Sequence, residues 1–204
     1  MSRRLHLIRK LIHSVFRLRP ESSYIGSMGT HPYPKKLVHN WELPDGTIVR
    51  IRPIRPEDAM IERAFVNALS DQSRYYRFLY SLRELTPEML ARFTQIDYDR
   101  EMAVIAVLGD PPNETQIGVA RYIPLPNGTT CEFAVVVADE WQGKGVAMHL
   151  VRPLIEHARE KGLTRMDGVV LAENTNMLNF ARMTGFTITS DPDDPSLMNI
   201  SLDL

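Results

Sequence analysis

The chain has 204 residues, enough for one globular domain with a buried core and an appended segment. Its hydrophobic fraction of 44%, charged fraction of 24% and formal net charge of −1 are ordinary for a soluble protein and indicate no nucleic-acid partner. No apolar run approaches the roughly 18 residues that a membrane span needs. The single cysteine, Cys131, excludes an internal disulfide and favours a reducing cytoplasm.

The first 20 residues are basic, with six Arg or Lys and no acid. Apolar residues recur in them at helical spacing, which predicts a basic amphipathic helix. This helix could pack on its own domain or on a neighbouring subunit, or dock weakly on an anionic membrane surface or a partner. Residues 20–36 have the composition of a linker. We therefore predict a basic helix and linker over residues 1–36 and a folded domain over residues 37–204.

From residue 47 onward the pattern predicts strands and helices in a defined order. A strand at 47–53 precedes a helix from 56 to about 69 and two short helices, and Thr86 and Pro87 are a typical start for the second of them. The later elements are strands 102–108, 116–123 and 131–138, helix 143–161, strand 165–171, helix 175–184, and strands 186–190 and 197–203. We expect Pro153 to kink or restart helix 143–161. This order predicts an α+β fold, a mixed sheet with helices on both faces.

A glycine-rich loop, WQGKGVA (141–147), lies between strand 131–138 and the next helix. A dinucleotide fingerprint would need glycine at position 148 and a P-loop would need a hydroxyl at position 145, and Met148 and Gly145 exclude both motifs. Glycine backbone and the first amides of a helix can still bind an anion, and Lys144 adds a positive charge. On this stretch alone, a site for a pyrophosphate-sized anion and a plain glycine turn both stay open.

Motifs around this loop carry a family resemblance. Gln142-x-x-Gly145-x-Ala147 is similar to the Q/R-x-x-G-x-G/A signature with which the GCN5-related N-acetyltransferases (GNATs) bind the pyrophosphate of acetyl-CoA. ENTNM (173–177) and RMTGF (182–186) resemble a second family segment. The blocks IRPIRPEDA (51–59), SRYYRFL (73–79) and CEFAVVV (131–137) resemble the acetyltransferase domain of Pat-type bacterial protein lysine acetyltransferases. The resemblance covers residues 33–204 and implies the GNAT fold, a central mixed, mostly antiparallel sheet flanked by helices.

Glu132 is the candidate catalytic residue. It stands in an apolar strand, where a carboxylate needs a function or a partner. The alternative is a glutamate that faces solvent or pairs with an arginine such as Arg121. A lysine amine, with a pKa of about 10.4, arrives protonated, so acetyl transfer to it needs a base. The resemblance implies that Glu132 is this general base, with Glu101 as second choice.

The resemblance also implies that acetyl-CoA is the co-substrate. Val135 and Val137 would offer backbone groups to the pantetheine arm, and Asn174 would lie near it or cap the following helix. The residues expected around the pyrophosphate are Gln142, Gly143, Lys144, Gly145, Val146 and Ala147. The sequence departs from many family members at Ala181, where they place a tyrosine that protonates the CoA thiolate. No metal is expected, because His149 and His157 are too far apart for a two-histidine site.

The sequence therefore predicts a cytoplasmic acetyl-CoA-dependent N-acetyltransferase that transfers the acetyl group directly to a protein lysine in a ternary complex. By resemblance, AMP-forming acyl-CoA synthetases are the first partners to consider, and no nucleic acid is expected. Two alternatives stay open: acetylation of a small amine such as a polyamine or amino sugar, and a non-catalytic acetyl-CoA sensor. The oligomeric state is left open.

Overall fold

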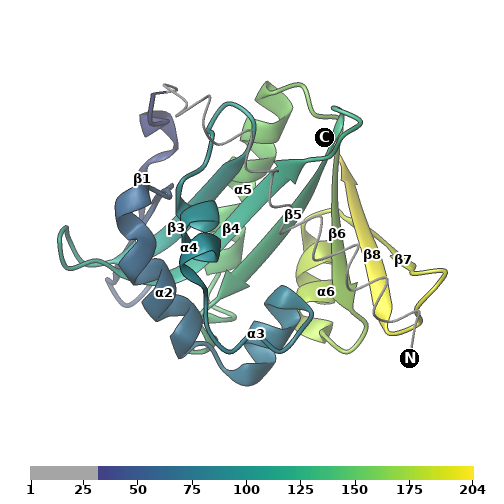
Figure 1. The fold of residues 1–204 in the computed structure, drawn as a ribbon, viewed down its shortest axis with the longest axis horizontal. Helices are drawn as coiled ribbons and strands as arrows, with labels where there is room; N and C mark the ends of the chain where they lie inside the picture. The colour runs from purple at the N-terminus through teal and green to yellow at the C-terminus, as the bar shows by residue number, and fades with distance from the viewer. Residues whose placement is uncertain (1–31) are drawn as a thin grey trace.

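The computed structural model describes residues 32–204, and its central feature is one twisted sheet (Figure 1). The predicted basic helix at residues 1–20 lies outside the described residues. The strands are β1 (His39–Glu42), β2 (Ile48–Pro53), β3 (Met102–Leu108), β4 (Thr115–Pro124), β5 (Thr130–Val137), β6 (Arg165–Leu171), β7 (Thr187–Ser190) and β8 (Leu197–Asp203). The helices are α2 (Ala59–Ala68), α3 (Asp71–Phe78), α4 (Pro87–Thr94), α5 (Val146–Glu160) and α6 (Thr175–Met183), with 3-10 turns η2 (Lys35–Leu37), η3 (Pro56–Asp58) and η4 (Asp139–Trp141).

The sheet is mixed, as the sequence predicts. Within the described residues it has eight strands in the order β1-β2-β3-β4-β5-β6-β8-β7. Neighbouring strands are antiparallel except for β5 and β6, which are parallel. The expected α+β class is confirmed.

The two parallel strands pair only at one end. Residues Thr130–Glu132 of β5 pair with Arg165–Asp167 of β6, after which the strands part (Figure 1). At the point of parting the ring of Phe133 covers Gly168, where a Cβ would lie 3.0 Å from Phe133 Cε1. The Phe186 ring packs on Phe133 with centroids 4.9 Å apart. The two aromatic rings therefore pack at one side of the gap between β5 and β6. Beyond this point the edge of β5 that faces β6 has no strand partner.

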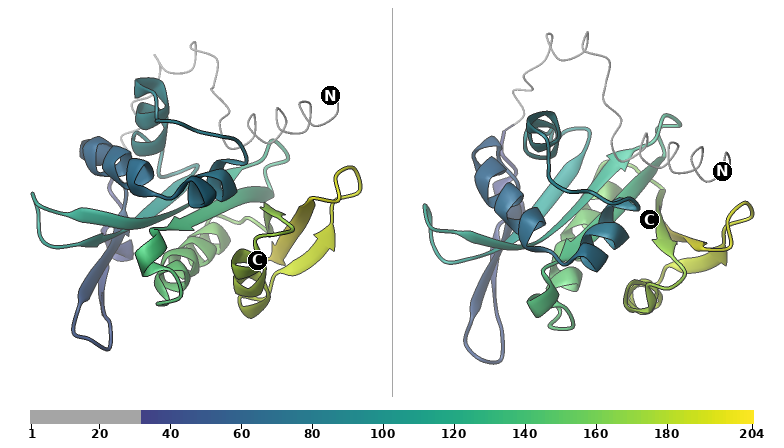
Figure 2. Two further views of the ribbon diagram at one scale, coloured as in Figure 1. Left: turned by 90° about the horizontal axis from the view of Figure 1, so that it is seen from below. Right: turned by 60° about the horizontal axis from the view of Figure 1, so that its bottom comes forward.

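Helices cover both faces of the sheet (Figure 2). On one face, α2, α3 and α4 pack around a core that includes Val136 of β5. On the other face, α5 and α6 pack around a core that includes Cys131 and Phe133. Because strand side chains alternate, Glu132 lies on the α2–α4 face, opposite to Cys131, as expected.

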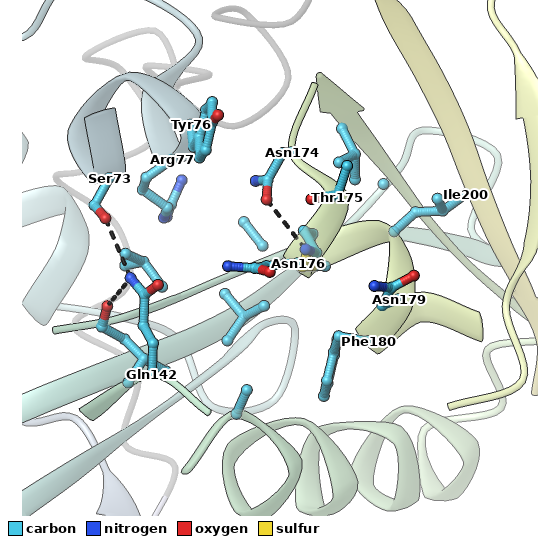
Figure 3. A pocket seen from close by; sticks show the side chains of 18 of the residues that line it. Ser73, Tyr76, Arg77, Gln142, Asn174, Thr175, Asn176, Asn179, Phe180 and Ile200 are labelled. Atoms are coloured by element: carbon cyan, nitrogen blue, oxygen red, sulfur yellow. Dashed lines mark hydrogen bonds between the residues drawn. The ribbon is translucent and has the colours of Figure 1, made fainter. Parts of the chain in front are cut away.

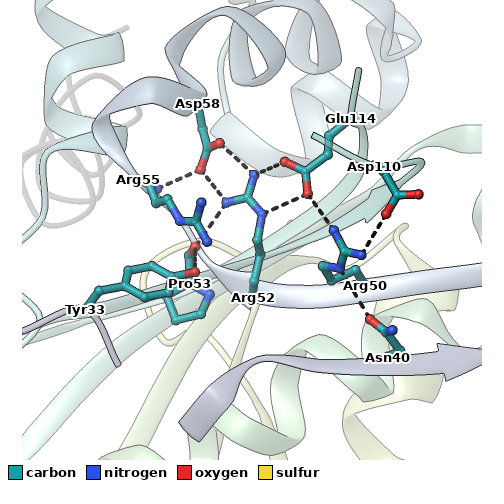
Figure 4. A network of polar contacts seen from close by, with 9 residues as sticks. All are labelled: Tyr33, Asn40, Arg50, Arg52, Pro53, Arg55, Asp58, Asp110 and Glu114. Atoms are coloured by element: carbon teal, nitrogen blue, oxygen red, sulfur yellow. Dashed lines mark hydrogen bonds and ion pairs between the residues drawn. The ribbon is translucent and has the colours of Figure 1, made fainter. Parts of the chain in front are cut away.

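A buried ion-pair network fixes the corner where β2 leads into α2 (Figure 4). The Arg52 guanidinium, 2% exposed, donates to both carboxylate oxygens of Asp58 over 2.7 Å and to Glu114 over 2.7 Å. Removing one partner of such a buried pair typically costs about 3–5 kcal/mol, because it leaves an uncompensated charge. The network therefore anchors the first turn of the helical layer that faces Glu132.

Three local details differ from the sequence prediction. The helix after the glycine loop begins at Val146 rather than at 143, because Gly143 and Gly145 have φ of 74° and 91°, outside the helical range. This helix runs unbroken through Pro153, so the prediction that the helix could restart there is wrong. The edge strand β1 was not predicted, since its sequence HNWE has no apolar alternation.

Candidate active site

A cavity of about 900 Å³ opens where β5 and β6 part (Figure 3). One wall comes from α3, the floor from β5, and the opposite wall from β6, β8 and α6. The loop before α5 closes one end. Of the residues predicted for the site, Glu132, Val135, Val137, Gln142, Gly143, Gly145, Val146, Ala147 and Asn174 all line this cavity.

The glycine loop next to the cavity has backbone amides that are not used in loop or cap hydrogen bonds. Within residues 32–204, no loop or cap hydrogen bond is donated by the amide of Gly143, Lys144 or Gly145. The first amides of α5 have no intrahelical acceptor, and the helix dipole adds partial positive charge there. Gly145 also lies against Trp41, whose Cη2 would be 3.4 Å from a Cβ at that position. The loop is therefore shaped to receive an anion through its backbone.

The Gln142 side chain holds the loop in place through hydrogen bonds to neighbouring segments. Its side-chain amide donates to the Val137 carbonyl over 3.1 Å and to Ser73 Oγ over 3.2 Å. Its backbone amide donates to the Asp139 carbonyl over 3.3 Å. These three bonds make Gln142 a tie between the end of β5, the loop and α3.

The Lys144 side chain packs on Trp141 and does not line the cavity. Its Nζ lies 4.6 Å from the centroid of the Trp141 ring, a cation–π contact. Trp141 lines the cavity, whereas Lys144 is not among the residues that do. Its positive charge therefore acts from the rim of the cavity.

The floor of the cavity offers backbone groups. Val135 and Val137 lie beyond the last β5–β6 pair, so the edge of β5 that faces β6 has no ladder partner there. Across the gap, the Asn174 side chain accepts a hydrogen bond from the Met177 amide over 3.1 Å and caps α6. Asn174 thus caps its helix and lines the cavity at once, and the two expected roles are compatible.

Glu132 is half-buried on the cavity side of β5. Among the charged side chains near it is Arg77 of α3. The second-choice base, Glu101, does not line the cavity. Glu101 is 9% exposed and forms a two-fold ion pair with Arg92, both bonds being 2.8 Å. Glu101 is therefore a structural partner of α4 and not a candidate for the general base.

The α3 wall brings in residues that were not predicted as site residues. Ser73, Tyr76 and Arg77 line the cavity from this helix. Burial, together with the like charge of Arg121, lowers the pKa of the Arg77 guanidinium to about 10, although the carboxylates of Glu62 and Glu132 oppose the shift. The sequence signal was the block SRYYRFL (73–79), which does not single out the arginine.

A chain of short hydrogen bonds fixes α3 at its N-terminus. The Asp139 carboxylate accepts bonds of 2.7 Å from both Ser70 Oγ and Ser73 Oγ, and one of 2.9 Å from the Ser70 amide. Burial opposes the charge of Asp139, but these bonds outweigh it and lower its pKa. The carboxylate therefore stays ionised at neutral pH and connects the end of β5 to α3.

Three further features concern what the described residues lack. Residues 32–204 contain no group of three or more His, Cys, Asp or Glu side chains that could hold a metal ion. In the same part of the chain, no helix is long and apolar enough to cross a membrane. Ala181 is fully buried in the core, so its position offers no proton donor to the cavity.

Known proteins are similar to this chain in sequence and in fold. The family model of the acetyltransferase (GNAT) domain matches residues 49–187. An acetyltransferase of Pseudomonas aeruginosa is 39% identical over 152 residues, which cover 74% of this chain and 82% of the relative. The acetyltransferase Pat of Mycolicibacterium smegmatis is 30% identical over 129 residues, covering 62% of this chain but 38% of that longer protein. The crystal structure of the GNAT domain of S. lividans PAT superimposes with a TM-score of 0.76 at 29% identity, over 85% of this chain and 100% of that domain.

Proposed function

The chain belongs to the GNAT family of acetyl-CoA-dependent acetyltransferases, and on that premise we propose that it acetylates lysine side chains of a protein, with Glu132 as general base. The observation that carries this proposal is the position of Glu132. It lines the same cavity as the glycine loop and lies on the sheet face covered by α3. The cofactor and the acceptor amine can therefore approach the same point from two sides of the sheet.

The proposed reaction needs one displacement and the loss of two protons from the amine nitrogen. Glu132, directly or through a water, takes the first proton from the lysine ammonium and leaves a neutral amine. The amine nitrogen forms a bond to the thioester carbonyl carbon, the C–S bond breaks to release CoA as the thiolate, and the nitrogen gives its second proton to that thiolate or to solvent. We assign the β5 edge at Val135 and Val137 to the pantetheine arm, and the loop Gly143–Ala147 to the pyrophosphate. Gln142 holds that loop through its bonds to Val137 and Ser73.

The protein acceptor is supported by the relatives and by the open cavity. The acetyltransferase Pat of Mycolicibacterium smegmatis is similar to 62% of this chain, and the GNAT domain of S. lividans PAT superimposes on 85% of it. AMP-forming acyl-CoA synthetases are the first acceptors to test. We also propose that residues 37–204 are the catalytic domain, that residues 1–36 are an appended segment, and that the protein acts in the cytoplasm.

The test is acetyl transfer from labelled acetyl-CoA to proteins of a host lysate, with identification of the modified residues. The Glu132→Gln variant should bind acetyl-CoA with the parent Kd, since its side chain is isosteric. Its kcat/KM should fall roughly 10²–10⁴-fold, the usual contribution of a general base. Glu140→Gln, an exposed glutamate outside the cavity lining, is the matched control. A Glu132→Gln enzyme within threefold of the parent would reject the base assignment.

The two alternatives give distinct results in the same assay. Modification of small amines without any protein lysine would indicate a small-molecule acetyltransferase. Tight binding of acetyl-CoA with no turnover on any amine would indicate a sensor.

A further inference from the structure

The acceptor side of the cavity carries a positive charge that the transfer step does not use. Arg77 lies on the α3 wall, half-buried, and its guanidinium points into the cavity (Figure 3). Tyr76 and Gln72 line the same wall, and Gln72 Nε2 donates to Tyr76 Oη over 2.9 Å. The wall is therefore polar, and Arg77 is its cationic member.

The charges behind this wall already have partners of their own. Glu62, 2% exposed, is hydrogen-bonded to the Gln116 side chain. Arg121, 3% exposed, donates to the Phe93 carbonyl over 2.9 Å and lies 4.5 Å from the Phe93 ring centroid. Arg77 adds a second guanidinium close to both of these groups.

This arrangement sets two opposite charges at the acceptor's end of the cavity. Glu132, the proposed base, lines the cavity together with Arg77, and the two side chains are close enough to interact electrostatically. A polyamine would place a second ammonium near the guanidinium, and like charges in a partly desolvated cavity repel. An acceptor that carries a carboxylate near its amine would match both charges.

We propose that Arg77 binds a carboxylate that the acceptor carries next to its reacting amine, and so selects lysines with an acidic neighbour. This inference rests on the proposed function. Arginine suits the role because its planar guanidinium donates two parallel hydrogen bonds to one carboxylate. In a protein the carboxylate is the side chain of an adjacent Asp or Glu. In a small acceptor it would be the carboxyl group of an amino acid.

The test compares acceptors that differ in one carboxylate. End-blocked peptides with the pair Lys-Glu are measured against the isosteric Lys-Gln peptides. A second arm compares Nα-acetyl-lysine with its amide, which separates a free carboxyl group from a side-chain carboxylate. We expect the acidic peptide to have a kcat/KM about tenfold higher, as one charge-assisted contact provides. A preference confined to Nα-acetyl-lysine would overturn the assignment to a side-chain neighbour.

Variants then connect the preference to Arg77. Arg77→Gln should reduce the ratio of the two kcat/KM values to about one, and Arg77→Lys should retain part of it, because lysine keeps the charge without the planar pair of donors. Arg74→Gln is the control, since Arg74 lies on the same helix, pairs with Asp71 and does not line the cavity. Melting temperature and acetyl-CoA Kd confirm that each variant is folded.

The outcomes separate this inference from the proposed function. If the parent acetylates lysine peptides with equal kcat/KM for Lys-Glu and Lys-Gln, the role of Arg77 is overturned and the proposed function stands. If a folded Arg77→Gln enzyme keeps the preference, Arg77 is again excluded. If the parent binds acetyl-CoA but acetylates no amine, the proposed function fails first and this inference fails with it.

Discussion

Gln142 and Ser73 are joined by a hydrogen bond of 3.2 Å from the glutamine side-chain amide to the serine hydroxyl. The same hydroxyl donates to Asp139 over 2.7 Å. These hydrogen bonds connect the glycine loop, which we assign to the pyrophosphate, with α3, the wall that we assign to the acceptor. The cofactor end and the acceptor end of the cavity are therefore mechanically connected.

Replacing Ser73 with Ala should disturb both ends at once. The change removes one hydrogen bond from the Gln142 amide and one from the Asp139 carboxylate, each of which keeps its other partners, so the loss is about 0.5–1.5 kcal/mol per bond. We expect the acetyl-CoA Kd and the acceptor KM to rise several-fold together. Isothermal titration and steady-state kinetics measure the two constants. Ser81→Ala, an exposed serine outside the network, is the control. A change in only one constant would show that the two ends are independent.

The sequence was informative where the chemistry is local. The loop at 142–147 could be interpreted because helix-start amides and glycines act within a few consecutive residues, and Glu132 stood out as a charge in an apolar strand. The sequence did not indicate Arg77 or Ser73 as site residues. Their roles depend on how α3 packs over β5, and these two elements are distant in sequence. The parting of β5 and β6 was also missed, since pairing is a property of two strands. The ion pair of Glu101 was missed for the same reason, because its partner Arg92 lies on a separate helix.

Gly143→Ala and Gly145→Ala should each weaken acetyl-CoA binding, and to a similar extent. Both glycines have positive φ, and alanine in that region costs roughly 1–2 kcal/mol. At Gly143 a Cβ would meet nothing within 4 Å, and at Gly145 it would make an ordinary van der Waals contact of 3.4 Å with the Trp41 ring. Backbone strain should therefore account for the loss at both positions. Acetyl-CoA titration of the two variants measures the loss, and parent-like Kd values would contradict the role given to the glycine loop.

Gly168→Ala should destabilise the fold at the point where the strands part. A Cβ there would lie 3.0 Å from Phe133 Cε1 and 3.2 Å from Ile200 Cγ1, so the Phe133 ring must move. Overpacking of this kind costs typically about 1–3 kcal/mol. Denaturant unfolding measures the loss of stability.

Phe133→Leu in the Gly168→Ala background provides the internal control. The smaller side chain makes room for the new methyl group, so the double variant should be more stable than the sum of the two single losses predicts. Additive losses would mean that the Phe133 ring does not constrain Gly168.

His157 should make the fold sensitive to mild acid. It is 5% exposed and its Nδ1 lies 2.7 Å from Tyr122 Oη. Burial lowers its pKa, as does Lys161, while Glu160 opposes the shift; Lys36 and Asp99 are the further charged groups near it. The unfolded chain, in which a histidine has a pKa of about 6.5, therefore binds more protons than the folded protein between the two values. The contribution of His157 to the stability of the fold is therefore complete above the pKa of the unfolded state. It is lost as the pH falls towards the pKa of His157 in the folded state.

Urea unfolding at pH 7.5, 6.0 and 5.0, values chosen to bracket a histidine pKa of about 6.5, tests this sensitivity. The parent should lose more stability on acidification than His157→Gln, which cannot take up the proton. Tyr122→Phe should be less stable at every pH but should keep most of the acid sensitivity, because its histidine is still buried. If the parent and His157→Gln lose stability in parallel, the acid sensitivity of the fold has another source, and the buried histidine is only a packing residue.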